Sequence, residues 1–159
     1  MNIRIVCIGK LKEKYWTEAV AEYSKRLRRF SSLEIVELKE SLLPANASLK
    51  DEEKVKEEEA REILKVLKKD EYVITLEIKG KPLSSEELAS KMANLALEGH
   101  PDVAFVIGGS LGLGPEVSKR ANFKLSFSNM TFPHQLMRVI LLEQIYRSFK
   151  INNNETYHK

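Results

Sequence analysis

The chain has 159 residues, a length typical of one domain, and its 43% hydrophobic and 31% charged content is ordinary for a globular protein. A single cysteine, Cys7, excludes an intrachain disulfide, and no Cys or His pair has the spacing of metal ligands. No run of 18 apolar residues is present, and the first residues resemble a strand more than a signal peptide. We therefore expect a cytoplasmic single domain, residues 1–159, with no membrane partner and no metal.

The net charge of +3 is unevenly distributed. Residues 103–159 hold seven Lys and Arg against three Glu, which gives +4, so residues 1–102 carry −1. A basic C-terminal third is compatible with an anionic partner.

Strand and helix patterns alternate from the first residues onward. An apolar run of strand length covers Ile3–Ile8, and apolar residues at i, i+4 spacing predict a helix over Lys14–Phe30. A second strand is expected at Leu33–Leu38, followed by a loop over residues 39–49, where a proline and small residues gather.

The same alternation continues through the middle of the chain. A strongly charged helix with one apolar stripe is expected over Lys50–Lys69, and a strand over Tyr72–Ile78. The run 79–82, Lys-Gly-Lys-Pro, ends that strand. Ser84 and Glu87 then form a capping box that begins a third helix.

The last third begins with Val103–Ile107, a strand without a polar residue, which suits a central parallel strand covered on both faces. A short helix begins at Pro115, a final strand is expected at Leu125–Phe127, and a last helix runs from Pro133 to about Lys150. This last helix is apolar almost all round, so we expect it to be covered on nearly all sides, with a second copy of the chain as its simplest partner.

The alternating order predicts an α/β fold, a mainly parallel sheet flanked by helices. Ligands in such sheets bind where strands end, and two loops stand there, Gly108–Gly114 and Phe127–Pro133. The first allows close approach of a ligand, but it is neither a Walker A motif nor a good dinucleotide-binding fingerprint. The second mixes apolar walls with hydroxyl and amide groups, a mixture that suits an adenine-type ring.

A set of short motifs, in collinear order from Met1 to Lys159, resembles the ribosomal large subunit RNA methyltransferase H family of the SPOUT class. The stretch Met130–Arg138 and the Tyr-His-Lys ending are the most specific of them together. The matching segments are Gly9–Lys12, Leu76–Glu77, Val106–Ser110, Leu125–Gln135, Arg138, Glu143–Arg147 and Tyr157–Lys159.

The resemblance implies properties that the hydrophobic pattern does not. It implies a C-terminal trefoil knot, a homodimer, and S-adenosyl-L-methionine as methyl donor. The implied reaction is methylation of N3 of a pseudouridine in 23S rRNA of the assembled ribosome. By position, the implied donor pocket consists of Leu76, Gly108, Phe127, Ser128, Asn129, Met130, Thr131 and Phe132.

The resemblance also implies that the tail, Tyr157–Lys159, lies beside the pseudouridine that accepts the methyl group. His158 is the candidate general base by residue type, with RNA contact as the alternative, and Tyr157 could stack on or hydrogen-bond the substrate. Arg138 faces either the pocket or a phosphate, or else forms an ordinary ion pair. Near position 154 the family often has glycine, and Asn154 stands there, a residue that tolerates left-handed backbone angles.

Other acidic and basic residues have less specific expected roles. We expect Glu143, in the middle of the apolar helix, to pair with Arg147 or Arg138, and His134 to be a structural residue at the helix start. Two basic groups could follow the phosphates of RNA: Lys10, Lys12 and Lys14 before the first helix, and Arg26, Arg28 and Arg29 at its end. For the three arginines, a solvated helix end with cations favoured by the helix dipole is an equally good explanation.

Two readings compete with methyl transfer. The first is a ribosome-associated binding protein without catalysis. The second is an α/β enzyme of another class that binds a nucleotide or dinucleotide.

Overall fold

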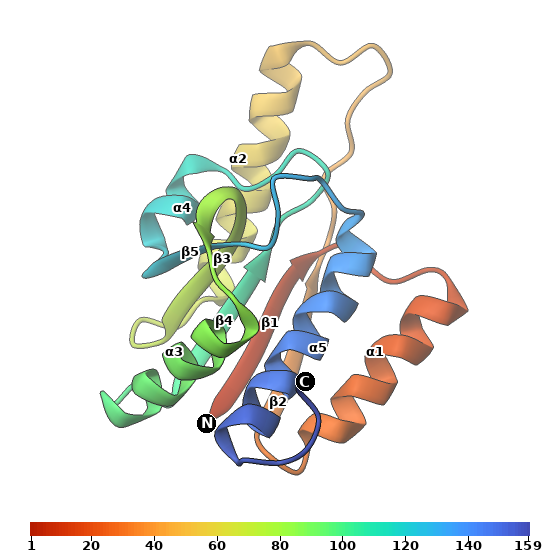
Figure 1. The fold of residues 1–159 in the computed structure, drawn as a ribbon. Coiled ribbons are helices and arrows are strands. Elements are labelled where there is room, and N and C mark those ends of the chain that lie inside the picture. Colours follow the sequence, from red (N-terminus) through yellow and green to blue (C-terminus); the bar gives the residue numbers. More distant parts are fainter.

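The computed structural model describes all residues, 1–159, and shows strands and helices in strict alternation (Figure 1). The order of elements therefore agrees with the sequence-based prediction. Their bounds are β1 (Asn2–Ile8), α1 (Lys14–Leu27), β2 (Ser32–Leu38), α2 (Leu49–Val66), β3 (Tyr72–Pro82), α3 (Ser85–Leu97), β4 (Asp102–Ile107), α4 (Pro115–Arg120), β5 (Phe123–Ser126) and α5 (His134–Asn152).

The five strands form one sheet in the order β2-β1-β4-β3-β5, and every neighbouring pair is parallel. Helices α1, α3 and α5 bury the larger core against one face of the sheet, and α2 and α4 bury a smaller core against the other. The predicted α/β architecture, a parallel sheet flanked by helices, is confirmed. Because all strands are parallel, their carboxyl ends lie at one edge, where the connecting loops gather.

The central strands are apolar because both of their faces are covered. In β4, Val103, Phe105 and Ile107 face the larger core, whereas Ala104 and Val106 face the smaller one. Phe105 has no exposed surface. A side chain on either face of such a strand is buried, so polar residues are excluded along its length.

Strand β3 is longer than predicted. The sequence Lys-Gly-Lys-Pro indicated a turn after Ile78, but pairing with β5 resumes beyond it, with a register shift between Leu76 and Lys81. Gly80 makes this return possible, because a Cβ atom there would lie 2.7 Å from the carbonyl oxygen of Lys124. The shift makes Leu76 the last residue of the regular part of the strand, at the edge where the loops lie.

Smaller differences concern element ends. Helix α1 ends at Leu27, three residues before the predicted Phe30. Strand β5 covers Phe123–Ser126, so it begins two residues before and ends one residue before the predicted Leu125–Phe127. The side chains of such short amphipathic segments carry little information about their ends.

Helix α5 lies between α1 and α3 on one face of the sheet (Figure 1). Its inner side buries Leu141, Leu142 and Ile145 in the larger core. Leu136 and Ile140, one turn apart, are only partly buried and pack against neither core. No helix of the protein is both long enough and apolar enough to cross a membrane.

Candidate functional site

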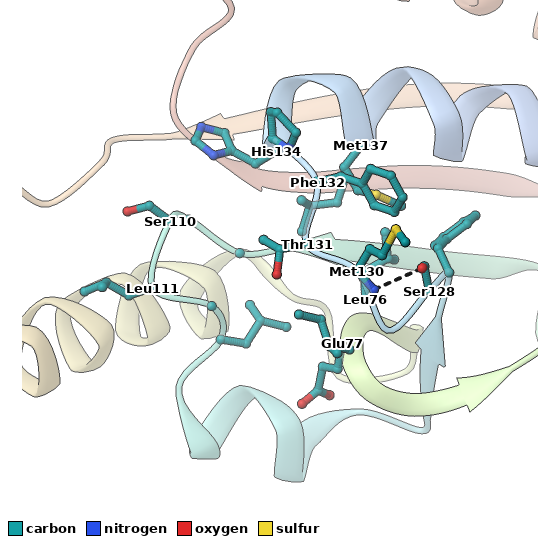
Figure 2. Close-up of a pocket in the computed structure, with 18 of the residues that line it drawn as sticks. Leu76, Glu77, Ser110, Leu111, Ser128, Met130, Thr131, Phe132, His134 and Met137 are labelled. Carbon is teal, nitrogen blue, oxygen red and sulfur yellow. Dashed lines mark hydrogen bonds between the residues drawn. The ribbon is translucent and has the colours of Figure 1, made fainter.

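A pocket of about 630 Å³ lies at the carboxyl edge of the sheet, where β3, β4 and β5 end (Figure 2). Three segments form its walls: residues 76–78 of β3, the loop 107–113 after β4, and the segment 125–134 that leads from β5 into α5. A cavity of this size, largely apolar with a few polar groups, is typical of a small-molecule site.

The glycine-rich loop forms one wall and turns back sharply on itself. Gly109 and Gly112 form an isolated bridge, in which the Gly112 amide donates to the Gly109 carbonyl oxygen at 3.0 Å. A Cβ atom at Gly108 would lie 3.0 Å from the carbonyl carbon of Gly112 and 3.0 Å from Cδ2 of Leu113. A larger residue at position 108 would therefore displace this wall.

The segment 127–133 forms the opposite wall, and two serines fix its path. The hydroxyl of Ser126, a residue only 5% exposed, lies 2.9 Å from the carbonyl oxygen of Ile78 and 3.2 Å from that of Ser128. The Met130 amide donates to the hydroxyl of Ser128 at 3.0 Å. The backbone amides of Thr131 and Phe132 have no acceptor within the chain, so both remain able to bind a ligand.

The structure brings seven of the eight expected donor-binding residues to this pocket. The exception is Asn129, which is exposed and does not line it. Asn129 lies at the turn between Ser128 and Met130, where its side chain faces solvent. Donor binding by the other seven stays a prediction; they are Leu76, Gly108, Phe127, Ser128, Met130, Thr131 and Phe132.

Six lining residues lie outside Leu76 and the two predicted loops, and three of them, Met137, Glu77 and His134, bear on the chemistry of the pocket. Met137 follows Pro133 by one helical turn, a spacing that could have placed it on the same wall. Strict alternation along a strand would put Glu77 on the face opposite Leu76, but the register shift after Leu76 lets both line the pocket. His134, expected only to begin the helix, does so and also lines the pocket, where burial and the nearby Arg138 lower the pKa of its imidazole.

Tyr157 and His158, the expected acceptor-side residues, fold back along α5. The Tyr157 hydroxyl donates to Glu143 Oε1 at 3.0 Å. Burial and the hydrogen bond to Glu143 raise the pKa of Tyr157 to about 12, so at neutral pH this phenol is a donor and not a base. Glu143 is paired with Arg147 at 2.7 Å, as one of its two predicted partners.

The ring nitrogens of His158 are both occupied. Nδ1 lies 3.2 Å from Arg147 Nη1, and Nε2 lies 2.8 Å from Glu86 Oε1. Because a guanidinium only donates, Nδ1 is the acceptor and the proton is on Nε2, which donates to Glu86. In this arrangement the His158 ring is held by two partners.

The path of the tail depends on a tight turn after α5. Asn154 has φ of 53°, the left-handed conformation that asparagine tolerates better than most residues. Glu155 then pairs with Arg29 at 2.8 Å and also with Lys150. These contacts fix the start of the tail between the last turn of α5 and the segment that follows α1.

Arg138 faces neither the pocket nor solvent. It is 2% exposed, its Nη1 donates to Glu37 Oε2 at 2.7 Å, and its Nη2 donates to the carbonyl oxygens of Ile8 and Gly9 at 3.0 and 2.7 Å. Arg138 therefore forms the ion pair that was the alternative expectation, and it joins α5 to the end of β1. A catalytic role for Arg138 stays a prediction.

Residues 1–158 match the family described as "Predicted SPOUT methyltransferase". This chain belongs to the SPOUT methyltransferase family. It is 60% identical over 159 residues to the ribosomal RNA large subunit methyltransferase H of Clostridium novyi, and 55% identical to that of Clostridioides difficile, with all of each chain covered.

The fold is similar to that of a solved structure. That structure is described as "a probable methylase family protein from Haemophilus influenzae Rd KW20", with 17% identity and a TM-score of 0.57. The match covers 99% of this chain and 70% of that one.

Within one copy of this SPOUT methyltransferase, the pocket and the tail are separate. The pocket is formed at the start of α5, by His134 and Met137, whereas the tail contacts Glu143 and Arg147. At 1.5 Å per residue, the six residues from Met137 to Glu143 span about 9 Å along the helix axis. No tail residue lines the pocket.

Proposed function

We propose that this protein transfers a methyl group from S-adenosyl-L-methionine to N3 of a pseudouridine in 23S rRNA of the assembled ribosome. The observation that carries the proposal is the pocket itself, with apolar walls, two unpaired amides and the close packing of Gly108 against Gly112 and Leu113. The names of the Clostridium relatives support rRNA of the large subunit as the substrate. A ribosomal substrate would place the protein in the cytoplasm.

The residues of the pocket fit the donor. Phe127, Met130 and Phe132 offer apolar surfaces for the faces of an adenine ring, and the free amides of Thr131 and Phe132 can bind its edge. When bound, S-adenosyl-L-methionine supplies a methyl group on a sulfonium that is a good leaving group. The chain's own contribution is to hold that group in position and exclude water, and positioning can supply roughly 7–11 kcal/mol.

The tail supports an acceptor role. The acceptor N3–H must lose its proton at or before attack, and a general base would accelerate this step by about 10²–10⁴-fold. His158 is the candidate, and it must leave Arg147 or exchange it for the substrate before its Nδ1 can accept a proton. Tyr157, which remains protonated, is suited to hydrogen-bond or stack on the base.

The separation of tail and pocket supports a homodimer. Leu136 and Ile140 present an apolar surface on the outer side of α5, and Glu143 and Arg147 continue that side toward the tail. Two α5 helices packed antiparallel about a two-fold axis would place the tail of one copy near the pocket of the other. Each complete site would then contain residues of both subunits.

Ile140→Glu is expected to convert the protein to a monomer, because it places a charge in the centre of this apolar surface. Sedimentation velocity measures the change. Lys79→Glu, on an exposed part of β3, is the control for an added carboxylate. A variant Ile140→Glu that still sediments as a dimer would exclude α5 from the interface.

We also infer the trefoil knot of the family. Strand β5 lies at the sheet edge beside β3, whereas α5 returns to the centre between α1 and α3, so residues 127–133 must cross the ends of β3 and β4. This crossing is the course that a threaded C-terminal segment would take. Single-molecule extension tests it, since a knotted chain stretches to less than its full contour length.

Gly108→Val is expected to weaken S-adenosyl-L-methionine binding at least about 10-fold, because added atoms would displace Leu113 and the backbone of Gly112. Isothermal calorimetry measures the affinity, and the thermal midpoint shows whether the variant remains folded. Unaltered affinity in a folded variant would remove Gly108 from the donor site.

The function itself is tested by mass spectrometry of rRNA from cells that lack and regain the gene. A methylated pseudouridine that disappears and returns supports the proposal, whereas an unchanged rRNA refutes it. Thermal shifts separate the competing readings: the proposal predicts stabilisation by S-adenosyl-L-methionine, and stabilisation only by ATP or NAD would favour a nucleotide enzyme.

A further inference from the structure

The electrostatics of the pocket depend on one residue. Glu77 is its only charged lining side chain, and no Lys or Arg contributes to its walls. Figure 2 shows Glu77 on the side of the pocket opposite Thr131 and Phe132. The other titratable lining residue, His134, has a lowered pKa and does not offset the negative charge.

The hydrogen bonds of Glu77 fix its carboxylate without neutralising it. The Thr75 hydroxyl donates to Oε2 at 2.6 Å, and the Ser118 hydroxyl of α4 donates to Oε1 at 2.7 Å. Thr75 has no exposed surface, so this support is rigid. No ion pair involves Glu77, in contrast to Glu143 or Glu37, each of which has an arginine partner.

The charge of the donor changes during the reaction. S-adenosyl-L-methionine carries a sulfonium, an ammonium and a carboxylate, a net charge of +1. Loss of the methyl group leaves the electron pair of the broken bond on sulfur, which gives a neutral thioether product with a net charge of zero. A fixed negative charge in the wall therefore interacts more favourably with the donor than with the product.

We propose that Glu77 is a specificity-determining residue that makes the pocket prefer the cationic donor to its neutral product. The inference rests on the proposed function, since it assigns a role within the donor pocket. The same carboxylate disfavours polyanionic ligands such as ATP and NAD, whose phosphates would find no basic side chain there. Loss of the attraction after transfer favours release of the product.

The test compares the affinities of the donor S-adenosyl-L-methionine and the product S-adenosylhomocysteine by calorimetry in four proteins. In Glu77→Gln, which keeps size and hydrogen-bonding oxygen but not charge, the preference for donor over product should fall about 3–10-fold relative to the wild type. Glu77→Asp keeps the charge and should retain most of the preference. Ser118→Ala is the matched control, because it removes a hydrogen bond to the carboxylate but leaves the charge.

The outcomes separate a charge effect from a structural one. If Glu77→Gln weakens donor and product equally, or if Ser118→Ala lowers the preference as much as Glu77→Gln does, Glu77 only ties β3 to α4 and the inference fails. If the wild-type protein binds neither donor nor product, the proposed function fails as well. Binding of both by the wild type, with an unchanged ratio in Glu77→Gln, overturns the inference alone.

Discussion

Removal of Tyr157–Lys159 should lower the rate of methyl transfer to ribosomes by about 10²–10⁴-fold, which is the contribution of a positioned general base. The affinity for S-adenosyl-L-methionine should not change. The reason is the separation of the two sites: the tail contacts Glu143, Arg147 and Glu86 but does not line the pocket. Single-turnover methylation of ribosomes measures the rate, and calorimetry measures the donor affinity. A truncated protein with a wild-type rate would refute the role of the tail.

Two point variants divide the effect between the residues of the tail. His158→Gln keeps a hydrogen-bonding side chain but cannot accept a proton in the relevant pH range, so a base would show as a lower kcat with the pH dependence lost. A histidine that only contacts RNA would instead raise KM and leave kcat unchanged. Tyr157→Phe removes the donor to Glu143 and is the control for loosening the tail without changing His158.

The fold could be predicted because a strand that is buried on both faces has a continuous apolar sequence. Val103–Ile107 has no polar residue, and the structure places it between the two cores. The extension of β3 could not be predicted, because Lys-Gly-Lys-Pro has the composition of a turn. Only the neighbouring strand β5 makes it a return to pairing, and that contact is distant in sequence.

The candidate site shows the same limit. The loops that carry it could be located, since glycine and polar residues interrupt apolar runs where strands end. Glu77 could not be assigned, because its orientation depends on a register shift between two strands. The position of the tail relative to the pocket also required the structure, since no pattern in the sequence states where residues beyond a helix fold back.

The resemblance places Arg138 among the residues expected to act in catalysis, with an ordinary ion pair as the alternative. Its surroundings instead explain a buried cation. Two carbonyl oxygens at the end of β1 and one carboxylate bind its two Nη atoms, whereas its buried Nε has no partner within the chain. The helix that carries the pocket residues His134 and Met137 is thereby fixed to the central sheet.

Arg138→Ala should therefore reduce the free energy of unfolding by about 3–5 kcal/mol, the cost of breaking a buried charged network by removing one partner. The change leaves the carbonyl oxygens of Ile8 and Gly9 without a donor and opens a cavity beside them. For a protein of this size the thermal midpoint should fall by roughly 6–20 °C. Urea unfolding, followed by circular dichroism, measures the loss.

Glu37→Gln is the matched control. Glu37 is 34% exposed, so its ion pair with Arg138 is partly screened and its loss should cost less than about 1 kcal/mol. If the two variants destabilise equally, the ion pair and not the carbonyl contacts determines the role of Arg138.

A third variant, Arg138→Lys, separates positioning from RNA contact. Lysine keeps the charge but cannot span Glu37 and both carbonyl oxygens, so a positioning residue predicts lower stability with an unchanged salt dependence of ribosome binding. If Arg138 contacted a phosphate instead, Arg138→Lys would change the stability of the protein little. Arg138→Ala would then remove the phosphate contact, and the slope of log affinity for ribosomes against log salt would fall by about one. That pair of results would return Arg138 to the substrate side. The burial of its guanidinium at the end of β1 leads us to expect the opposite, a loss of stability that precedes any loss of binding.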